Sequence, residues 1–200
     1  DDKRIFDHVE DFGGNVLMTS PNHQSGTDRC AEVALQYPEY DIIVNVQGDE
    51  PFIQPSQIDE LIGFLKDNDS YSIATQKKLI EDSDDLFSPN VVKVVSDLHQ
   101  KALYFSRAPI PYYRGLKGDD WCKHCAYFKH IGLYAFKKKA LLHVKDLPIS
   151  ELEKTESLEQ LRWLENGIAI GVQETSYQTI GIDTPEDLEK IKSYLKSADS

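Results

Sequence analysis

The chain alternates between segments with apolar residues at helical spacing and short apolar or β-branched runs. Helical spacing predicts helices around Ile5, Phe6, Val9 and Phe12; Cys30, Val33 and Ala34; Ile58, Leu61, Ile62 and Leu65; and Leu158, Leu161 and Leu164. Short β-prone runs predict strands at 15–18, 42–46, 71–75, 131–136, 168–172 and 178–182. Such alternation is typical of an α/β domain in which helices cover a largely parallel sheet.

The middle of the chain departs from this alternation. Residues 91–95 and 102–105 are β-prone runs joined by a polar turn, which predicts a hairpin in place of a βαβ crossover. We therefore expect one domain over residues 1–200 with a β-rich lobe inserted at 91–136. Because no strand precedes the first helix, we also expect the front of this domain to be missing.

Two aspartates are predicted to lie beyond the carboxyl ends of strands. Asp49 follows the run 42–46 in a Gly-containing turn, and Asp183 follows the run 178–182 ahead of the last predicted helix. Open α/β sheets bind ligands at this edge, and Mg²⁺ prefers carboxylate and phosphate oxygens. If the two strands are neighbours, the pair suits metal-assisted nucleotidyl transfer. The alternatives are that Asp49 or Glu50 caps a turn and that Asp183 complements a helix dipole.

The polar segment 23–29 is a third candidate. Ser25 and Gly26 at a helix start expose backbone N–H groups to an anion or a base edge, and Asp28 and Arg29 follow them. The alternative is an ordinary helix cap, because many helices begin in this way. Several other polar residues are weaker candidates. Each of them, taken alone, is explained equally well by exposure to solvent or by a local partner as by a role in a binding site: Arg107, His130, Tyr134, Glu159 and Gln160.

Composition narrows the classes of partner. The chain has 22 Lys and Arg against 34 Asp and Glu, which gives a formal net charge of −12. Nucleic acids and anionic membrane surfaces both attract basic patches, so we expect no nucleic-acid partner and no membrane association. No run approaches the ~18 apolar residues of a membrane-spanning helix.

The three cysteines do not form a recognisable framework. Cys122 and Cys125 make a C-x-x-C pair with His124 and His130 nearby. A structural zinc site normally needs a second spaced pair, and a redox C-x-x-C opens a helix after a first strand. We expect neither kind of site here. An odd number of cysteines in a chain of this size favours a reducing cytoplasm.

Six motifs occur in one order along the chain. They are HQSGTDR at 23–29, NVQGDEP at 45–51, SRAPIP at 106–111, KHIGLYAF at 129–136, LEQLR at 158–162 and GIDTPEDL at 181–188. Together they closely resemble the 3-deoxy-manno-octulosonate (Kdo) cytidylyltransferase family, and the resemblance spans essentially the whole chain.

The resemblance implies a Rossmann-like α/β nucleotidyltransferase fold with a mixed, mostly parallel sheet and a β-rich dimerisation lobe. It implies that CTP and Kdo react to give CMP-Kdo and pyrophosphate, with Mg²⁺ as cofactor, in a cytoplasmic homodimer that serves lipopolysaccharide biosynthesis. Asp49 and Asp183 would be the catalytic, metal-binding carboxylates. The matching motifs place Ser25, Gly26, Asp28 and Arg29 beside the nucleotide. They place Gln47, Arg107, His130, Tyr134, Glu159 and Gln160 in the sugar-acid site.

One motif of the family has no counterpart in the chain. Members begin with a strand and a loop whose basic residues hold the triphosphate, and nothing here matches that loop. We therefore expect negligible turnover from residues 1–200 alone. Two alternatives stay open: a cytidylyltransferase for an amino-substituted Kdo or a sialic acid, and a noncatalytic remnant whose lobe only dimerises or binds a partner.

Overall fold

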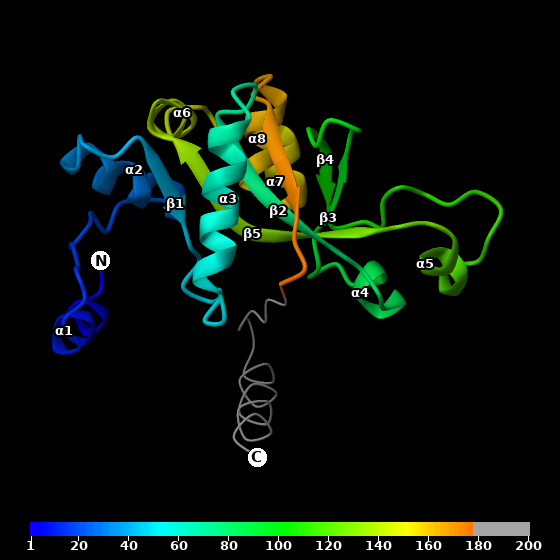
Figure 1. Cartoon of the computed structure of the whole chain (residues 1–200), viewed down its shortest axis with the longest axis horizontal. Coiled ribbons are helices and arrows are strands. Elements are labelled where there is room, and N and C mark those ends of the chain that lie inside the picture. Colours follow the sequence, from blue (N-terminus) through cyan, green and yellow to red (C-terminus); the bar gives the residue numbers. More distant parts are fainter. Residues whose placement is uncertain (178–200) are drawn as a thin grey trace, which may run out of the picture.

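The structure is a computed structural model that describes residues 1–177 around one mixed sheet (Figure 1). The strands are β1 (Ile42–Asn45), β2 (Ile73–Leu79), β3 (Lys93–Ser96), β4 (Ala102–Ser106), β5 (Phe128–Lys137) and β6 (Ile170–Glu174). The helices are α1 (Lys3–Asp11), α2 (Gly26–Gln36), α3 (Pro55–Asp67), α4 (Ser83–Phe87), α5 (Trp121–His124), α6 (Lys138–Val144), α7 (Glu151–Glu156) and α8 (Glu159–Glu165), with a 3₁₀ turn at Gly118–Asp120. Mixed helices and strands confirm the predicted α/β class.

β5 is the strand around which the sheet is organised. The strand order is β4-β3-β5-β2-β6, and β1 also pairs with β5. Both β1 and β2 run antiparallel to β5, and β6 runs parallel to β2. The strands β1, β2 and β6 therefore point the same way, and their carboxyl ends lie at one edge of the sheet.

The sheet is mixed, as predicted, but it has fewer parallel strand pairs than the mostly parallel arrangement that the resemblance implies. Among the described strands, β2 and β6 form the one parallel pair. The physical reason is the position of β5, which lies between β1 and β2 and runs against both. Two strands that point the same way are thus separated by one of opposite direction.

β1 and β3 share one edge of β5 and leave a gap between them. β1 pairs with residues 134–137, whereas β3 pairs at Lys129, next to which the amide of His130 donates to the carbonyl of Val92. Along the described chain no strand pairs with residues 131–133 from this edge. The gap leaves the middle of β5 open to side chains from other elements.

β1 is only partly buried, although a nearly continuous apolar run such as 42–46 is typical of a central strand buried on both faces. Its first three residues, Ile42 to Val44, are only partly buried, and Asn45 is the buried one. Within the part of the chain that the structure describes, β5 is the one strand with which β1 pairs. An apolar run signals a strand, but it does not say how many neighbours that strand has.

Helices cover both faces of the sheet, as Figure 1 shows for α3 in front of it and for α6 and α8 behind it. α2, α6 and α8 pack on one face around Phe136 and Trp163. α3 buries Leu61 on the other face, in the same cluster as Leu133 of β5. Because successive residues of β5 alternate between these two clusters, its sequence is apolar at nearly every position from 131 to 136.

The predicted lobe at 91–136 supplies β3, β4 and most of β5 to the common sheet. The segment between β4 and β5 extends away from the body of the protein as an arm that carries α5 (Figure 1). A separate apolar cluster of Ile80, Leu86, Trp121 and Tyr127 stabilises the base of this arm. The lobe is therefore continuous with the main sheet.

Several expected elements differ from the structure or lie beyond it. Residues 15–18 form no strand, and β2 begins two residues later than predicted. The prediction has no counterpart of α4, α5 and α7, because helices of four to six residues are too short to show apolar periodicity. The strand expected at 178–182 and the helix after it lie outside the described residues.

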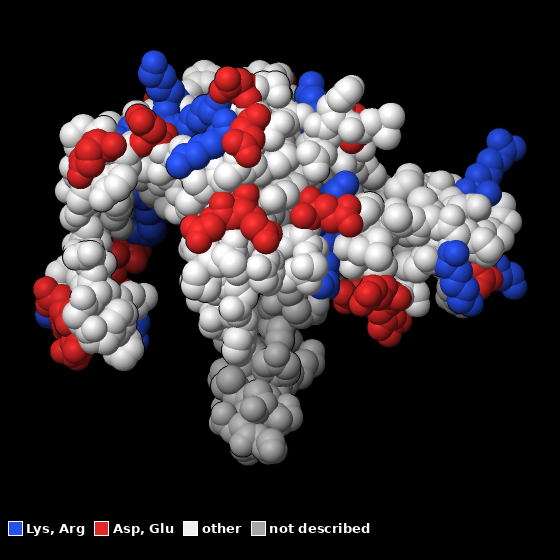
Figure 2. All heavy atoms as spheres, viewed as in Figure 1, with Lys and Arg blue, Asp and Glu red and all other residues white. Residues whose placement is uncertain are grey.

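Acidic side chains are prominent on the surface. Figure 2 shows them over α3 and α4 on one face of the molecule, as expected for a net charge of −12. Over residues 1–177, no helix combines the length and the apolar character needed to cross a membrane.

Candidate active site

A cavity of about 220 Å³ opens beside the gap in the edge of β5. Its walls come from the N-terminus of α2, the end of β1, the middle of β5 and the start of α8. The residues that line it are Gly26, Thr27, Asn45, Gln47, His130, Gly132, Tyr134, Ser157, Leu158, Glu159, Gln160 and Trp163. The end of β1 brings this cavity to the edge of the sheet where ligands are predicted to bind.

Six of the predicted site residues lie in these walls: Gly26, Gln47, His130, Tyr134, Glu159 and Gln160. They come from four segments that are far apart in the sequence, and the fold brings them to one place. Their individual roles toward a ligand stay predictions. Of the predicted residues, Ser25, Asp28, Arg29, Arg107 and Asp49 do not line this cavity.

His130 is held from several sides. Its Nε2 atom lies 2.9 Å from the hydroxyl of Thr75, and its ring packs against Phe105 and Tyr134. Burial lowers the pKa of His130 to about 3. The imidazole is therefore neutral near pH 7 and interacts through hydrogen bonds, not as a cation.

Tyr134 brings a buried hydroxyl that has no hydrogen-bond partner among the described residues. Burial, with the nearby charge of Glu159 as a smaller cause, raises the pKa of Tyr134 well above its ordinary value. A buried polar group without a partner costs free energy. A hydroxyl of this kind in a cavity wall is suited to a polar atom of a ligand.

Glu159 is fixed through both carboxylate oxygens. One accepts a hydrogen bond from the Thr27 hydroxyl at 2.8 Å, and the other accepts one from Arg162 at 2.5 Å. Arg162 is itself buried and also pairs with Glu153. Burial raises the pKa of Glu159, and the contacts with Thr27 and Arg162 oppose that shift. The network joins α2 to α8 and holds the cavity wall in place.

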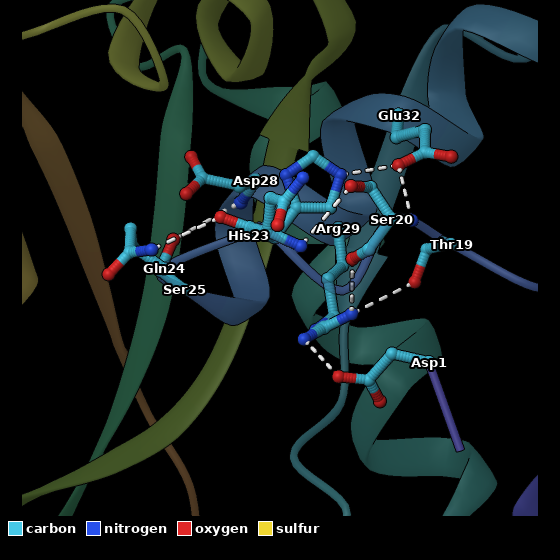
Figure 3. A network of polar contacts seen from close by, with 10 residues as sticks. Asp1, Thr19, Ser20, His23, Gln24, Ser25, Asp28, Arg29 and Glu32 are labelled. Atoms are coloured by element: carbon cyan, nitrogen blue, oxygen red, sulfur yellow. Dashed lines mark hydrogen bonds and ion pairs between the residues drawn. The ribbon is translucent and has the colours of Figure 1, made fainter.

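The segment predicted to lie beside the nucleotide forms the N-terminal cap of α2 (Figure 3). The hydroxyl of Ser25 accepts a hydrogen bond from the amide of Asp28 at 3.2 Å. Gly26 follows the cap and approaches β1 closely, since a Cβ atom there would lie 3.6 Å from the side chain of Asn45. The capping interpretation is thus correct for Ser25, while Gly26 also lines the cavity.

Arg29 stabilises the loop that precedes α2. Its guanidinium donates to the hydroxyl of Thr19 and to the carbonyl of Ser20, and it pairs with the carboxylate of Asp1 at 2.5 Å (Figure 3). In the same network His23 contacts the carboxylate of Glu32. The arginine predicted beside the nucleotide is therefore engaged by the protein's own oxygens.

Arg107 lies next to the cavity without lining it. Its Nε donates to the carbonyl of Glu156 at 2.7 Å, and its Nη1 donates to the carbonyl of Pro89 at 2.9 Å. Glu156 directly precedes Ser157, which lines the cavity. These contacts use two of the five N–H donors of the guanidinium, so two parallel hydrogen bonds from Nη1 and Nη2 to the carboxylate of a sugar acid do not require either contact to break.

Asp49 is exposed in the turn that follows β1. The amide of Glu50 donates to the carbonyl of Gln47 at 3.2 Å and closes this turn. Asp183 lies outside the described residues, so its position relative to Asp49 is not described. No three His, Cys, Asp or Glu side chains converge anywhere in residues 1–177. Asp49 stands two residues after Gln47, which lines the cavity, and its exposed carboxylate is the kind of ligand that fits Mg²⁺, an ion that takes one or two carboxylates and completes its shell with water and phosphate oxygens.

Six lining residues have no site role in the sequence prediction: Thr27, Asn45, Gly132, Ser157, Leu158 and Trp163. Four of them lie inside the motifs at 23–29, 45–51, 129–136 and 158–162. These four residues could therefore have been found from the sequence, because each of them belongs to one of the motifs. Ser157 and Trp163 lie just outside the motif at 158–162, where only the fold reveals them.

Curated relatives match almost the whole chain. Residues 1–191 match the family model described as cytidylyltransferase. The chain is 51% identical over 200 residues to the 3-deoxy-manno-octulosonate cytidylyltransferase of Parabacteroides distasonis, which covers 98% of this chain and 79% of the relative. It is 50% identical over 201 residues to the protein of the same name from Porphyromonas gingivalis, with the same coverage.

Solved structures agree with the sequence relatives. A CMP:2-keto-3-deoxy-manno-octonic acid synthetase in complex with CTP matches with a TM-score of 0.89 at 40% identity, over 99% of this chain and 79% of that one. The 4-diphosphocytidyl-2C-methyl-D-erythritol synthase of Anaerococcus prevotii, with a TM-score of 0.58 and 15% identity over 97% of this chain and 76% of that one, shares the fold alone. The chain belongs to the cytidylyltransferase family and, within it, to the 3-deoxy-manno-octulosonate cytidylyltransferases.

Proposed function

We propose that the protein transfers a cytidylyl group from CTP to Kdo, forming CMP-Kdo and releasing pyrophosphate. The observation that carries the proposal is the cavity in which four side chains meet: neutral His130, Tyr134, whose hydroxyl has no partner among residues 1–177, Glu159 and Gln160. Hydrogen-bonding groups of this kind are what the many hydroxyls of a sugar acid require. A relative that is 51% identical is named for this reaction, which supports the proposal.

The reaction makes one bond and breaks one. The anomeric hydroxyl oxygen of Kdo bonds to the α-phosphorus of CTP and releases its proton to solvent, while the bond from that phosphorus to the departing pyrophosphate oxygen breaks and the electron pair stays on pyrophosphate. Negative charge grows on the phosphate oxygens as this happens. Gly26 and Thr27 place the N-terminus of α2 in the cavity wall, and the positive end of a helix dipole favours an anion there.

The proposal includes Mg²⁺, which would be held by Asp49 and, by resemblance, by Asp183. When bound, the ion supplies positive charge to the phosphate oxygens of the nucleotide. We expect Asp49→Asn to remove most of the Mg²⁺-dependent part of the affinity for CTP, measured by isothermal titration calorimetry with and without the ion. Asp59→Asn, an exposed aspartate on α3, is the matched control and should change nothing. Equal affinities in the two variants would contradict the role of Asp49.

Two tyrosines provide a matched test of the sugar-acid site. Tyr134 and Tyr127 both have buried hydroxyls without a partner among the described residues, but only Tyr134 lines the cavity. We expect Tyr134→Phe to weaken Kdo binding about threefold to tenfold, the value of one neutral hydrogen bond, and Tyr127→Phe to leave it unchanged. Calorimetry in the presence of Mg²⁺ and CTP measures both.

The outcomes of this test are distinct. Kdo binding that weakens in Tyr134→Phe alone supports the proposed site. Pyrophosphate release by residues 1–200 that requires both CTP and Kdo would support the transfer reaction and would overturn the expectation of negligible turnover. Absence of Kdo binding by the unmodified chain, or equal effects in the two variants, would contradict the proposal. Titration with an amino-substituted Kdo and with a sialic acid tests the alternative substrates, because a tighter complex with either would replace Kdo as the acceptor.

Three finer features belong to the proposal through the sequence resemblance: a homodimer, a cytoplasmic location and a contribution to lipopolysaccharide biosynthesis. The arm and the hairpin carry exposed apolar side chains, among them Tyr112 and Leu103, which support an interface on this side of the protein. Sedimentation equilibrium should give twice the chain mass of 22.8 kDa. A single-chain mass at micromolar concentration would contradict the homodimer.

A further inference from the structure

Thr75 is a buried threonine behind the cavity. It lies in β2, its side chain is fully buried, and it is not among the residues that line the cavity. Three polar atoms surround its hydroxyl: Nε2 of His130 at 2.9 Å, the carbonyl oxygen of Ile131 at 3.0 Å and the carbonyl oxygen of Leu133 at 2.8 Å.

The number of protons at this hydroxyl fixes the direction of each hydrogen bond. A threonine hydroxyl has one proton to donate, and a backbone carbonyl can only accept. If Nε2 of His130 accepted this proton, both carbonyl oxygens would lie beside the hydroxyl oxygen with no hydrogen between them. The favoured arrangement therefore donates the proton to the carbonyl of Ile131 or Leu133 and leaves the oxygen to accept from His130. Nε2 of His130 must then carry a hydrogen. Because burial keeps this imidazole neutral near pH 7, its Nδ1 carries a lone pair and can only accept.

The same hydroxyl also closes an irregularity in the sheet. The register between β2 and β5 shifts after Thr75, so that Gly132 and Leu133 have no partner in β2. The carbonyl oxygens of Ile131 and Leu133, on either side of Gly132, both lie within hydrogen-bond distance of the Thr75 hydroxyl. Because Gly132 lines the cavity, Thr75 supports the shape of the cavity wall as well as the tautomer of His130.

We propose that Thr75 is a positioning residue that fixes His130 as its Nε2–H tautomer and thereby makes Nδ1 an acceptor for a hydroxyl of the sugar acid. The second half of this inference rests on the proposed function. No described residue forms a hydrogen bond with Nδ1. Since sugar hydroxyls donate as well as accept, an obligate acceptor distinguishes a hydroxyl from a group that only accepts, such as a keto oxygen.

The test is ¹⁵N NMR of the full chain with labelled histidine rings, in which His130→Gln assigns the signals of His130. We expect the unmodified protein to carry the proton on Nε2 and to show a shift of the Nδ1 signal when Kdo is added. Thr75→Ser, which retains the hydroxyl, should give the same spectrum. Thr75→Val, which is nearly isosteric and lacks the hydroxyl, should populate both tautomers.

A binding measurement accompanies the spectra. We expect Thr75→Val to weaken Kdo binding about threefold to tenfold with no change in CTP affinity, and Thr75→Ser to restore it. The matched control is Thr155→Val, whose hydroxyl donates to the carbonyl of Glu151 on exposed α7 and should change neither spectrum nor affinity.

The outcomes separate this inference from the proposed function. A proton on Nδ1 in the unmodified protein, or an unchanged tautomer in Thr75→Val, overturns the role of Thr75 whether or not Kdo binds. If the tautomer behaves as expected but Kdo does not bind, the proposed function and the acceptor role of Nδ1 fail, while the positioning of His130 by Thr75 is supported.

Discussion

Lys93 offers a stringent test of the packing beside the site. Its side chain is fully buried, and its Nζ donates to the carbonyls of Ser88 at 2.8 Å, Val91 at 2.5 Å and Arg107 at 2.6 Å. Burial lowers the pKa of Lys93, and the charge of Glu156 opposes that shift. Three carbonyls thus replace water around one ammonium group. Lys93→Met keeps the length and the apolar stem of the side chain and removes the donors.

The expected loss of stability in Lys93→Met follows from these three hydrogen bonds. Each buried carbonyl left without a donor costs about 1–3 kcal/mol, and loss of the desolvated charge offsets part of the sum. We expect Lys93→Met to lower the free energy of unfolding by about 3–4 kcal/mol. In a protein of this size, that corresponds to a decrease in Tm of roughly 6–16 °C. The loop that carries Arg107 should loosen as well, because one of the three carbonyls belongs to that residue.

Urea denaturation followed by circular dichroism measures this difference. Lys78→Met is the matched control, since Lys78 lies on β2 and its Nζ donates to one carbonyl, that of Ser176, at an exposed position. We expect the control to change the free energy of unfolding by less than about 0.5 kcal/mol. If Lys93→Met stayed within about 1 kcal/mol of the unmodified protein, the three hydrogen bonds would not hold the loop and the reasoning would be refuted.

Three further predictions concern the sheet and the cavity. Gly171→Ala would bring a methyl group to 2.6 Å from the ring of Phe64, so denaturation should show a loss of about 1–3 kcal/mol. Because the pKa of His130 is about 3 when folded against 6.5 otherwise, the unfolded state binds an extra proton between these values. The free energy of unfolding should therefore fall by up to about 1.4 kcal/mol per pH unit as the pH drops from 6.5, and His130→Gln should remove that part of the slope. Thr27→Val removes a donor to Glu159 and should cost about 1 kcal/mol by the same assay.

The sequence predicted the residues of the cavity better than it predicted how they are held. Motifs at 129–136 and 158–162 identified His130, Tyr134 and Glu159, because those motifs belong to a family whose site was implied with them. The partners of charged side chains were beyond the reach of local patterns. Arg107 contacts Glu156 across 49 positions of the chain, and only the fold shows that contact.

Strand pairing was the other part that a sequence pattern does not encode. The apolar run at 131–136 correctly predicted a strand, but a strand buried on both faces looks the same whether its neighbours run with it or against it. The direction of β5 between β1 and β2 was therefore open, and so was the register shift after Thr75. Gln76 is a buried polar residue inside a strand, and its hydrogen bonds with Gln57 and Gln173 explain why it is tolerated there. The sequence does not show those partners.

The register shift in β5 is compatible with the site because it involves two residues. Side chains of a strand alternate between its faces, so an extra single residue would move every later side chain to the opposite face. Gly132 and Leu133 are unpaired together, which leaves the alternation unchanged. His130, Gly132 and Tyr134 therefore all line the cavity, while Ile131 and Leu133 pack toward α3. Between 130 and 134 the odd positions thus pack in the cluster under α3 and the even ones line the cavity, so an insertion or deletion of one residue between 131 and 133 would turn His130 toward the α3 side.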